Sequence, residues 1–205
     1  MKKNGNGRRG PRRIPEVLDL QEQRQLLSQL EPTNTLLKLR NFTMLRILLN
    51  CGLRSAELCN LKTQNIDFKT GKMKVRGKGD KERILWIGDD DLLLLKAWLE
   101  QRPSSNLMSS SKLVFTSLDG KRPICSRWLR KLLPRLAKRA GIDKRVHVHT
   151  CRHSFASDLL RKTKNLVIVQ CALGHTSINT TAIYTHISNP EMEIALKNLR
   201  NGEGS

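Results

Sequence analysis

The sequence has no run of about 18 apolar residues, which excludes a membrane-spanning helix of ordinary length. Its N-terminus is charged and has no apolar stretch, so a secretory signal is not expected. Aspartate and glutamate are few, 18 against 38 lysines and arginines, and they form no cluster of the kind that a metal-dependent nuclease needs. Aromatic residues make up 4% of the chain, and Tyr184 is the only tyrosine.

Cysteine occurs five times, which is an odd number, and no Cys-x-x-Cys pair is present. A disulfide framework or a zinc site is therefore not expected. This pattern favours buried, reduced thiols in a cytosolic protein.

Positive charge is the dominant feature, because the formal net charge is +20 over 205 residues. A chain of this kind repels itself and favours an anionic partner. Nucleic acid is the leading candidate, since lysine and arginine release counterions when they neutralise phosphates. An anionic membrane surface is less favoured, because no basic amphipathic helix with aromatic residues stands out. A basic soluble protein without such a partner remains the alternative.

The two ends differ in composition from the rest. Residues 1–13 hold six basic residues and no acid, which predicts a disordered arm. The arm either lies along a phosphate backbone or is a solvated tail. One compact domain is expected over 14–200, and 201–205 should fray. The arginines of the arm that are candidates for DNA contact are Arg8, Arg9, Arg12 and Arg13.

The patterning predicts an α+β domain that is mainly α-helical and carries a small three-stranded antiparallel sheet. A capping box at Asp19 and Glu22 predicts a helix start, and Ser55 is expected to cap a short helix that ends near Leu61. Strands are expected at 66–68, 73–76 and 83–87, with a further short one at 113–116. Other helices are predicted at 36–49, 89–100, 125–140, 150–162, 166–173, 177–186 and 190–200.

Arg54 directly precedes a predicted helix start, where a guanidinium beside free backbone N–H groups suits phosphate binding. Glu57 lies one turn further on and is placed to orient Arg54. Lys78 stands between two glycines at a predicted hairpin tip, so it projects into a groove or donates a proton to a leaving oxygen. Taken alone, each of these residues also fits an ordinary surface cap or a solvated basic turn.

His149 and Arg152 are three residues apart at another helix start and share a face, which suits a phosphate whose charge grows in a transition state. His149 and His153 have the spacing of metal ligands, but no cysteine or carboxylate is suitably placed beside them. His175 and Tyr184 follow in a polar, threonine-rich context, where an ordinary helix-terminal histidine and a half-buried tyrosine are the alternatives.

Together these residues resemble the catalytic domain of the tyrosine recombinases, the phage-integrase family, and most closely its Xer-type members. The similarity extends over about residues 17–199. All six catalytic positions of the family are occupied. The matching motifs are Gly52-Leu53-Arg54-x-x-Glu57-Leu58, Gly77-Lys78-Gly79-x-Lys81-Glu82-Arg83, His149-x-x-Arg152-His153-Ser154-Phe155-Ala156 and Leu173-Gly174-His175 with Tyr184 nine residues later.

The resemblance implies a site-specific recombinase that cleaves and rejoins DNA through a 3′-phosphotyrosyl bond, with no cofactor or metal. Tyr184 would be the nucleophile, and Arg54 and Arg152 would bind the scissile phosphate. Lys78 would protonate the 5′-oxygen, and His149 would assist proton transfer at the tyrosine.

The resemblance assigns lesser roles to several further residues. His175 would hydrogen-bond a phosphate oxygen, Glu57 would support the arginines, and His153 would be structural. Lys81 and Arg83 are expected to contact DNA. The implied partner is double-stranded DNA at a specific site, bound by a homo-tetramer, which places the protein in the cytoplasm at the nucleoid.

The sequence departs from the family in two ways. Cys151 replaces a usual leucine at an expected packing position. The N-terminal core-binding domain of most relatives is not expected in this chain. The apolar stripe of 190–200 docks either in a neighbouring protomer or back onto its own core.

Two rival functions remain open. A type IB topoisomerase uses a similar residue set, and a DNA-binding regulator can share the fold without catalysis. The target sequence and the kind of genetic element are also open.

Overall fold

The computed structural model describes residues 15–31, 33–77, 82–102, 113–174 and 189–199. The expected basic arm with Arg8, Arg9, Arg12 and Arg13, the tail 201–205 and the helix expected at 177–186 lie outside the described residues. In chain order the elements are α1 (Leu20–Ser28), α2 (Leu36–Cys51), α3 (Ser55–Cys59), η1 (Thr63–Asn65), β1 (Lys72–Arg76), β2 (Glu82–Trp86), α4 (Asp89–Gln101), α5 (Ser126–Arg139), α6 (Val148–Thr163), α7 (Leu166–Leu173) and α8 (Asn189–Lys197).

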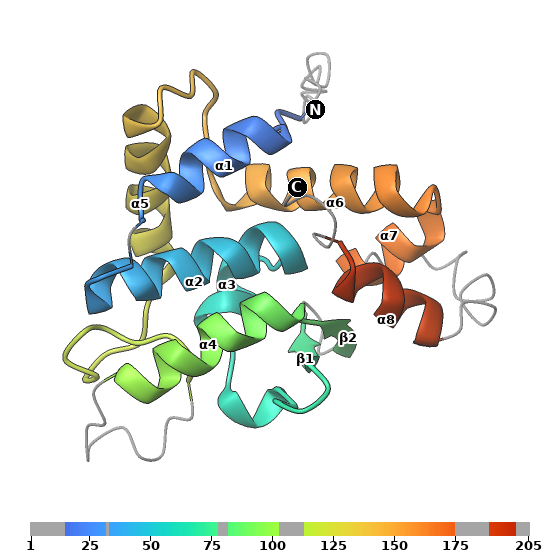
Figure 1. The fold of residues 1–205 in the computed structure, drawn as a ribbon, viewed down its shortest axis with the longest axis horizontal. Helices are drawn as coiled ribbons and strands as arrows, with labels where there is room; N and C mark the ends of the chain where they lie inside the picture. Colours follow the sequence, from blue (N-terminus) through green and yellow to red (C-terminus); the bar gives the residue numbers. More distant parts are fainter. Residues whose placement is uncertain (1–14, 32, 78–81, 103–112, 175–188, 200–205) are drawn as a thin grey trace, which may run out of the picture.

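The predicted class, mainly helical with a small antiparallel sheet, is confirmed (Figure 1). The capping box that begins α1 is present as predicted. The Asp19 carboxylate accepts from the Glu22 N–H at 2.8 Å, and the Asp19 N–H donates to Glu22 Oε2 at 2.8 Å. None of the described helices is long and apolar enough to cross a membrane.

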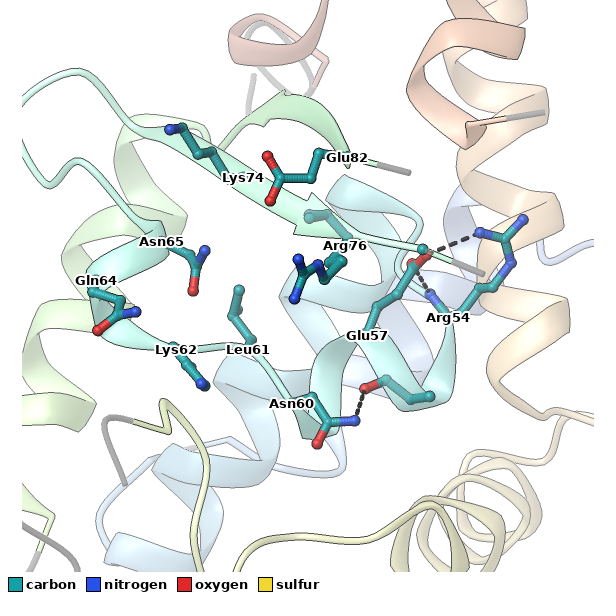
Figure 2. Close-up of a pocket in the computed structure, with 13 residues that line it drawn as sticks. Arg54, Glu57, Asn60, Leu61, Lys62, Gln64, Asn65, Lys74, Arg76 and Glu82 are labelled. Carbon is teal, nitrogen blue, oxygen red and sulfur yellow. Dashed lines mark hydrogen bonds and ion pairs between the residues drawn. The ribbon is translucent and has the colours of Figure 1, made fainter. Parts of the chain in front are cut away.

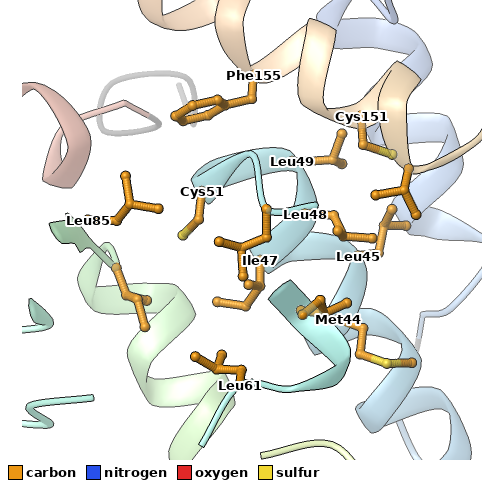
Figure 3. Packing of buried hydrophobic residues seen from close by; sticks show 14 of the residues in the cluster. Met44, Leu45, Ile47, Leu48, Leu49, Cys51, Leu61, Leu85, Cys151 and Phe155 are labelled. Atoms are coloured by element: carbon orange, nitrogen blue, oxygen red, sulfur yellow. The ribbon is translucent and has the colours of Figure 1, made fainter. Parts of the chain in front are cut away.

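The central helix is α2, in which 12 of 16 residues are buried. It packs against α4 and α6, which lie on either side of it (Figure 1). Figure 3 shows Ile47 and Leu48 of α2 in the same buried cluster as Leu85 of β2 and Phe155 of α6. Cys151 is also fully buried there, at the packing position that its place in the sequence predicts.

The sheet has two strands in the described residues, so the expectation of a third strand at 66–68 is wrong. Ile66 forms a single antiparallel bridge with Met73 and does not continue into a ladder. The reason is local, because the next residue closes a turn. The Asp67 carboxylate accepts from the Lys69 N–H at 2.9 Å and from the Thr70 hydroxyl at 2.8 Å. Of the strand expected at 113–116, only isolated bridges at its ends form.

The C-terminal helix α8 packs against β2 and α6 of the same chain. Its apolar stripe, formed by Met192, Leu196 and the following Leu199, is buried. Lys162 of α6 donates through Nζ to the Leu199 carbonyl at 3.1 Å and also bonds the Asn198 carbonyl. In the single chain, therefore, the stripe is covered by the protein's own core.

The expectation of buried thiols holds for Cys51, Cys59 and Cys151, whereas Cys171 is partly buried and Cys125 is exposed. Cys125 directly precedes α5, and the N-terminus of a helix favours an anion. Hydrogen bonds from the Trp128 and Arg127 N–H groups accordingly lower the pKa of the Cys125 thiol.

Candidate active site

Glu57 of α3 is the buried centre of the candidate site, with 4% of its side chain exposed. Its Oε1 pairs with Arg54 Nη1 at 2.9 Å, and its Oε2 accepts from the Arg54 backbone N–H at 2.7 Å. The backbone donor expected to be free for a phosphate is thus already taken. Ser55 was expected to cap α3, but the helix begins at Ser55 and its buried hydroxyl has no hydrogen-bond partner among the described residues.

Arg83 of β2 holds Glu57 from the other side in a two-pronged ion pair. Its Nη1 and Nη2 reach Glu57 Oε1 and Oε2 at 2.8 Å each, and its Nε donates to the Ala172 carbonyl at 2.8 Å. Only 9% of the Arg83 side chain is exposed. The sequence predicted a DNA contact for this residue. In the structure a buried carboxylate and a helix-terminal carbonyl occupy three donors of its guanidinium, and the DNA contact stays a prediction.

Arg152 of α6 is the third arginine near this carboxylate, with its Nη1 3.9 Å from Glu57 Oε2. It is 7% exposed and donates to the carbonyls of Gly52, at the end of α2, and Leu173, at the end of α7. Arginines bonding the last carbonyls of a helix also complement its dipole. The two predicted phosphate ligands, Arg54 and Arg152, are therefore brought together around Glu57.

The electrostatics of this cluster fix its charge states. Burial alone raises the pKa of the Glu57 carboxyl, but the hydrogen bonds and charges of Arg83 and Arg54 outweigh it and lower the pKa to about 2. Burial, followed by the charges of Arg54 and Arg83, lowers the pKa of Arg152 to about 10. At neutral pH the cluster thus carries one anion and three cations, and the excess positive charge suits an anionic ligand.

The histidines of the α6 motif lie at its solvent-exposed beginning. His149 is exposed, and its ring centroid is 6.0 Å from that of His147. His147 caps α6, with its Nδ1 accepting from the Thr150 N–H at 3.0 Å. This role was missed at the sequence level, although the His-x-His spacing before a helix was visible.

His153, for which the resemblance implies a structural role, is exposed on α6. Desolvation is the largest cause that lowers the pKa of His153, and the charges of His149 and Arg152 lower this pKa further. In the part of the chain that the structure describes, no group of three histidine, cysteine or acidic side chains is arranged to hold a metal ion.

Four predicted site residues lie outside the described residues: Lys78, Lys81, His175 and Tyr184. Three of them, Lys78, Lys81 and His175, adjoin described elements that contribute to the arginine cluster. Segment 78–81 joins β1 to β2, and β2 carries Arg83. His175 directly follows Gly174, the residue that ends α7 with a φ of 62°.

A polar groove of about 740 Å³ opens beside the cluster, between α3, η1 and β1. Figure 2 shows Arg54 and Glu57 at one end of it and Gln64 and Asn65 at the other. Arg54 is the most accessible of the three arginines, with 35% of its side chain exposed, and it lines this groove.

A model of the phage integrase family matches residues 16–191. The chain belongs to the phage integrase family. This confirms the resemblance found in the sequence motifs and places Arg54, Glu57, Arg83 and Arg152 inside the matched region.

Relatives within the phage integrase family include tyrosine recombinases. The chain is 39% identical over 179 residues to XerC of Xanthomonas campestris pv. campestris, covering 87% of this chain and 53% of the relative. It is 36% identical over 185 residues to XerD of Staphylococcus saprophyticus subsp. saprophyticus, covering 88% and 61%. The chain thus spans about half to two thirds of the length of these relatives.

Solved structures give the same assignment. The XerH site-specific recombinase bound to its difH substrate before cleavage matches with a TM-score of 0.67 and 32% identity, covering 87% of this chain and 52% of that one. The XerA recombinase matches with a TM-score of 0.70 and 29% identity, covering 95% and 67%. An integrase of mycobacterium phage Brujita, 21% identical with a TM-score of 0.70 over 93% of this chain and 60% of that one, shares the fold.

Proposed function

We propose that the protein is a tyrosine-type site-specific recombinase that cleaves and rejoins DNA through a covalent bond between Tyr184 and a 3′-phosphate. The observation that carries this proposal is the pairing of Arg54 and Arg152 around one buried carboxylate in a chain of the phage integrase family. Two guanidiniums held in this way suit the two non-bridging oxygens of a phosphodiester.

In the proposed first step, the Tyr184 hydroxyl attacks the phosphorus, and its proton passes to His149. The bond from phosphorus to the 5′-oxygen breaks, and Lys78 gives that oxygen a proton. Arg54 and Arg152 stabilise the charge that grows on the phosphoryl oxygens, with His175 as a further hydrogen-bond donor. Rejoining runs the same steps in reverse with a 5′-hydroxyl as nucleophile, so no outside energy source and no metal are needed.

Arg152 is suited to this task because its position is over-determined. Its guanidinium is anchored to the carbonyls of Gly52 and Leu173, which come from the ends of two different helices. Pre-oriented cations stabilise a transition state without having to reorganise during the reaction. Arg54 is freer at its outer edge, which suits the first contact with an incoming phosphate.

We propose double-stranded DNA with a specific recombination site as the substrate, bound by four copies of the chain. The relatives support the DNA, because XerH was crystallised with a difH substrate. Such a substrate places the protein in the cytoplasm at the nucleoid. Lys81 and the arm residues Arg8, Arg9, Arg12 and Arg13 are proposed as backbone contacts, on the strength of the net charge of +20.

Trapping on a nicked substrate tests this function. The protein is incubated in EDTA with DNA from its own locus carrying a nick next to the candidate cleavage site, beside a Tyr184→Phe variant. We expect a covalent protein–DNA species on a denaturing gel for the parent chain and none for the variant. Retained DNA binding without any adduct contradicts the proposal and favours a DNA-binding regulator. Metal-free relaxation of a supercoiled plasmid without recombination would indicate a topoisomerase.

A further inference from the structure

The groove beside Arg54 contains polar side chains that the protein itself does not use. In the described part of the chain, the side chains of Lys62, Gln64, Asn65 and Lys74 have no hydrogen-bond or ion-pair partner, although all four line this groove. Arg83 and Arg152 are different, because their donors are bound to Glu57 and to backbone carbonyls. Hydrogen-bond donors that line one groove and have no partner within the protein are available to a ligand.

The charge of the groove selects the class of ligand. Its lining includes the cations Arg54, Lys62, Lys74 and Arg76. Of its two carboxylates, Glu57 is buried and held by arginines, and Glu82 stands opposite Arg76 in the β1–β2 register. The ammonium groups of the two lysines, Lys62 and Lys74, and the two side-chain amides of the groove therefore have no acidic partner. This arrangement suits a ligand whose anionic groups are joined by polar groups.

The exposed face of β1 contributes one cation that no acidic residue opposes. Lys74 and Arg76 are both exposed and alternate with buried residues along β1, so they point to the same face. Glu82 stands opposite Arg76, so Lys74 is the cation of this face that is left for a phosphate. Arg54 closes one end of the groove, where the scissile phosphate is proposed to bind (Figure 2).

We propose that this groove holds the DNA backbone adjacent to the scissile phosphate, with Lys62 and Lys74 pairing with flanking phosphates. The amides of Gln64 and Asn65 donate to the sugar-phosphate backbone or to base edges beside them. The groove thereby sets which phosphate reaches Arg54. This inference rests on the proposed function, because it takes Arg54 as a ligand of the scissile phosphate.

An acidic segment of a second copy is the competing occupant. The chain supplies little for it, since it holds 18 acidic residues against 38 basic ones. Its acidic run at the start of α4 is partly consumed internally, because the Asp91 carboxylate binds Arg46 and Asn50, each at 2.5 Å. A net charge of +20 favours a nucleic acid over a second copy of the same chain.

The first test is the salt dependence of DNA binding. The double variant Lys62→Gln with Lys74→Gln is compared with Lys38→Gln with Lys96→Gln, which removes the same charge from α2 and α4 away from the groove. For the groove variant, the slope of log K against log salt should be about 1.8 less steep, since each phosphate contact contributes about 0.9. The control should keep the parent slope. An equal change in both variants, or no change in either, overturns the proposal.

The second test locates the phosphates and separates this inference from the reaction itself. Single phosphates beside the cleaved one are replaced by uncharged methylphosphonates, and binding is measured for the parent chain and for Lys74→Gln. At the contacted position the replacement should weaken the parent several-fold and leave the variant unaffected. If the replacement and Lys74→Gln weaken DNA binding additively at every flanking position, the groove assignment is overturned. It is also overturned if the groove variant changes only self-association. The covalent adduct is scored separately, so a chain that binds DNA in this way without forming it refutes the proposed function alone.

Discussion

At the scale of single residues, Glu57 determines how the cationic cluster is arranged. One buried carboxylate separates and orients Arg54 and Arg83, with Arg152 3.9 Å away. Without it, three guanidiniums would repel one another in a site of low polarity. Breaking a buried ion pair by removing one partner typically lowers the free energy of unfolding by about 3–5 kcal/mol. Glu57→Gln keeps the shape and removes the charge.

The free energy of unfolding of the parent chain should therefore fall at low pH, because Glu57 becomes protonated. Its carboxyl has a pKa of about 2 in the folded state against an ordinary value of 4.5, so it remains ionised where the unfolded chain is protonated. This contribution is complete above pH 4.5 and is lost as the pH falls towards 2. Between pH 5 and pH 3, the difference in unfolding free energy between the parent and Glu57→Gln should shrink by about 2 kcal/mol. Urea unfolding at both pH values measures it, and a constant difference would contradict the assignment.

For Arg83 the sequence predicts a contact with DNA, and the structure shows a pair of hydrogen bonds to Glu57. In Arg83→Lys the positive charge remains, but the two-pronged contact to Glu57 and the bond to the Ala172 carbonyl cannot all be kept. We expect the rate of covalent-adduct formation at saturating DNA to fall about 10–100-fold, because misplacing catalytic groups by small distances has effects of this size. The dissociation constant for DNA and its salt slope should stay close to those of the parent. A changed salt slope with an unchanged rate would instead support the DNA contact that the sequence predicts for Arg83.

The contact that the sequence predicted correctly, between Arg54 and Glu57, rests on a local signal. Arg54 and Glu57 are three positions apart at a helix start, so a single turn brings them together. The contact of Arg83 with Glu57 spans 26 residues and depends on how β2 packs beside α3, which no short motif encodes. The exposed position of His153 could not be predicted from its motif, because only the packing of α6 shows which side of this helix faces solvent.

At the scale of secondary-structure elements, the end of α2 links the core to the site. Gly52 has a φ of 60°, and a Cβ added to it would lie 2.2 Å from Phe155 Cδ1. The Gly52 carbonyl also accepts from Arg152. A side chain at this position would therefore disturb the helix end, the aromatic packing and the arginine together.

Gly52→Ala and Gly141→Ala form a matched pair, because Gly141 has a φ of 68° and open space around the added Cβ. Gly141→Ala should lower the free energy of unfolding by about 1 kcal/mol through its left-handed backbone alone. Gly52→Ala should lower it by about 1–3 kcal/mol more, through overpacking against Phe155. Thermal or urea unfolding compares the two. Equal losses would show that Phe155 moves aside freely.

Elements with strong local caps were predictable, whereas those decided by pairing were not. Asp19 with Glu22 begins α1, and Gly52 ends α2, as the sequence indicates. The expected third strand fails because Asp67 closes a turn with its own neighbours before a ladder can form. Strand pairing depends on distant partners, so an apolar triplet such as 66–68 does not define a strand by itself.

At the scale of the whole molecule, α8 joins the end of the chain to the strand that carries Arg83. It packs on β2 and α6, and Lys162 bonds the last carbonyls after it. A homo-tetramer in which this stripe docks into a neighbour would first have to release it from its own core. The free energy of that release therefore sets how readily the proposed assembly forms.

Leu196→Ala and Ile194→Ala measure this contact, because Leu196 is 3% exposed and Ile194 is 62% exposed on the same helix. In DNA-free protein, Leu196→Ala should lower the free energy of unfolding by about 2–4 kcal/mol, as expected when a buried leucine leaves a cavity. Ile194→Ala should change it by less than about 0.5 kcal/mol. Hydrogen exchange should show the loss spreading to the β2 amides if α8 and β2 open together. If both variants unfold like the parent at low protein concentration, α8 does not stabilise the free monomer, and its apolar stripe is then available to a neighbour without a prior release step.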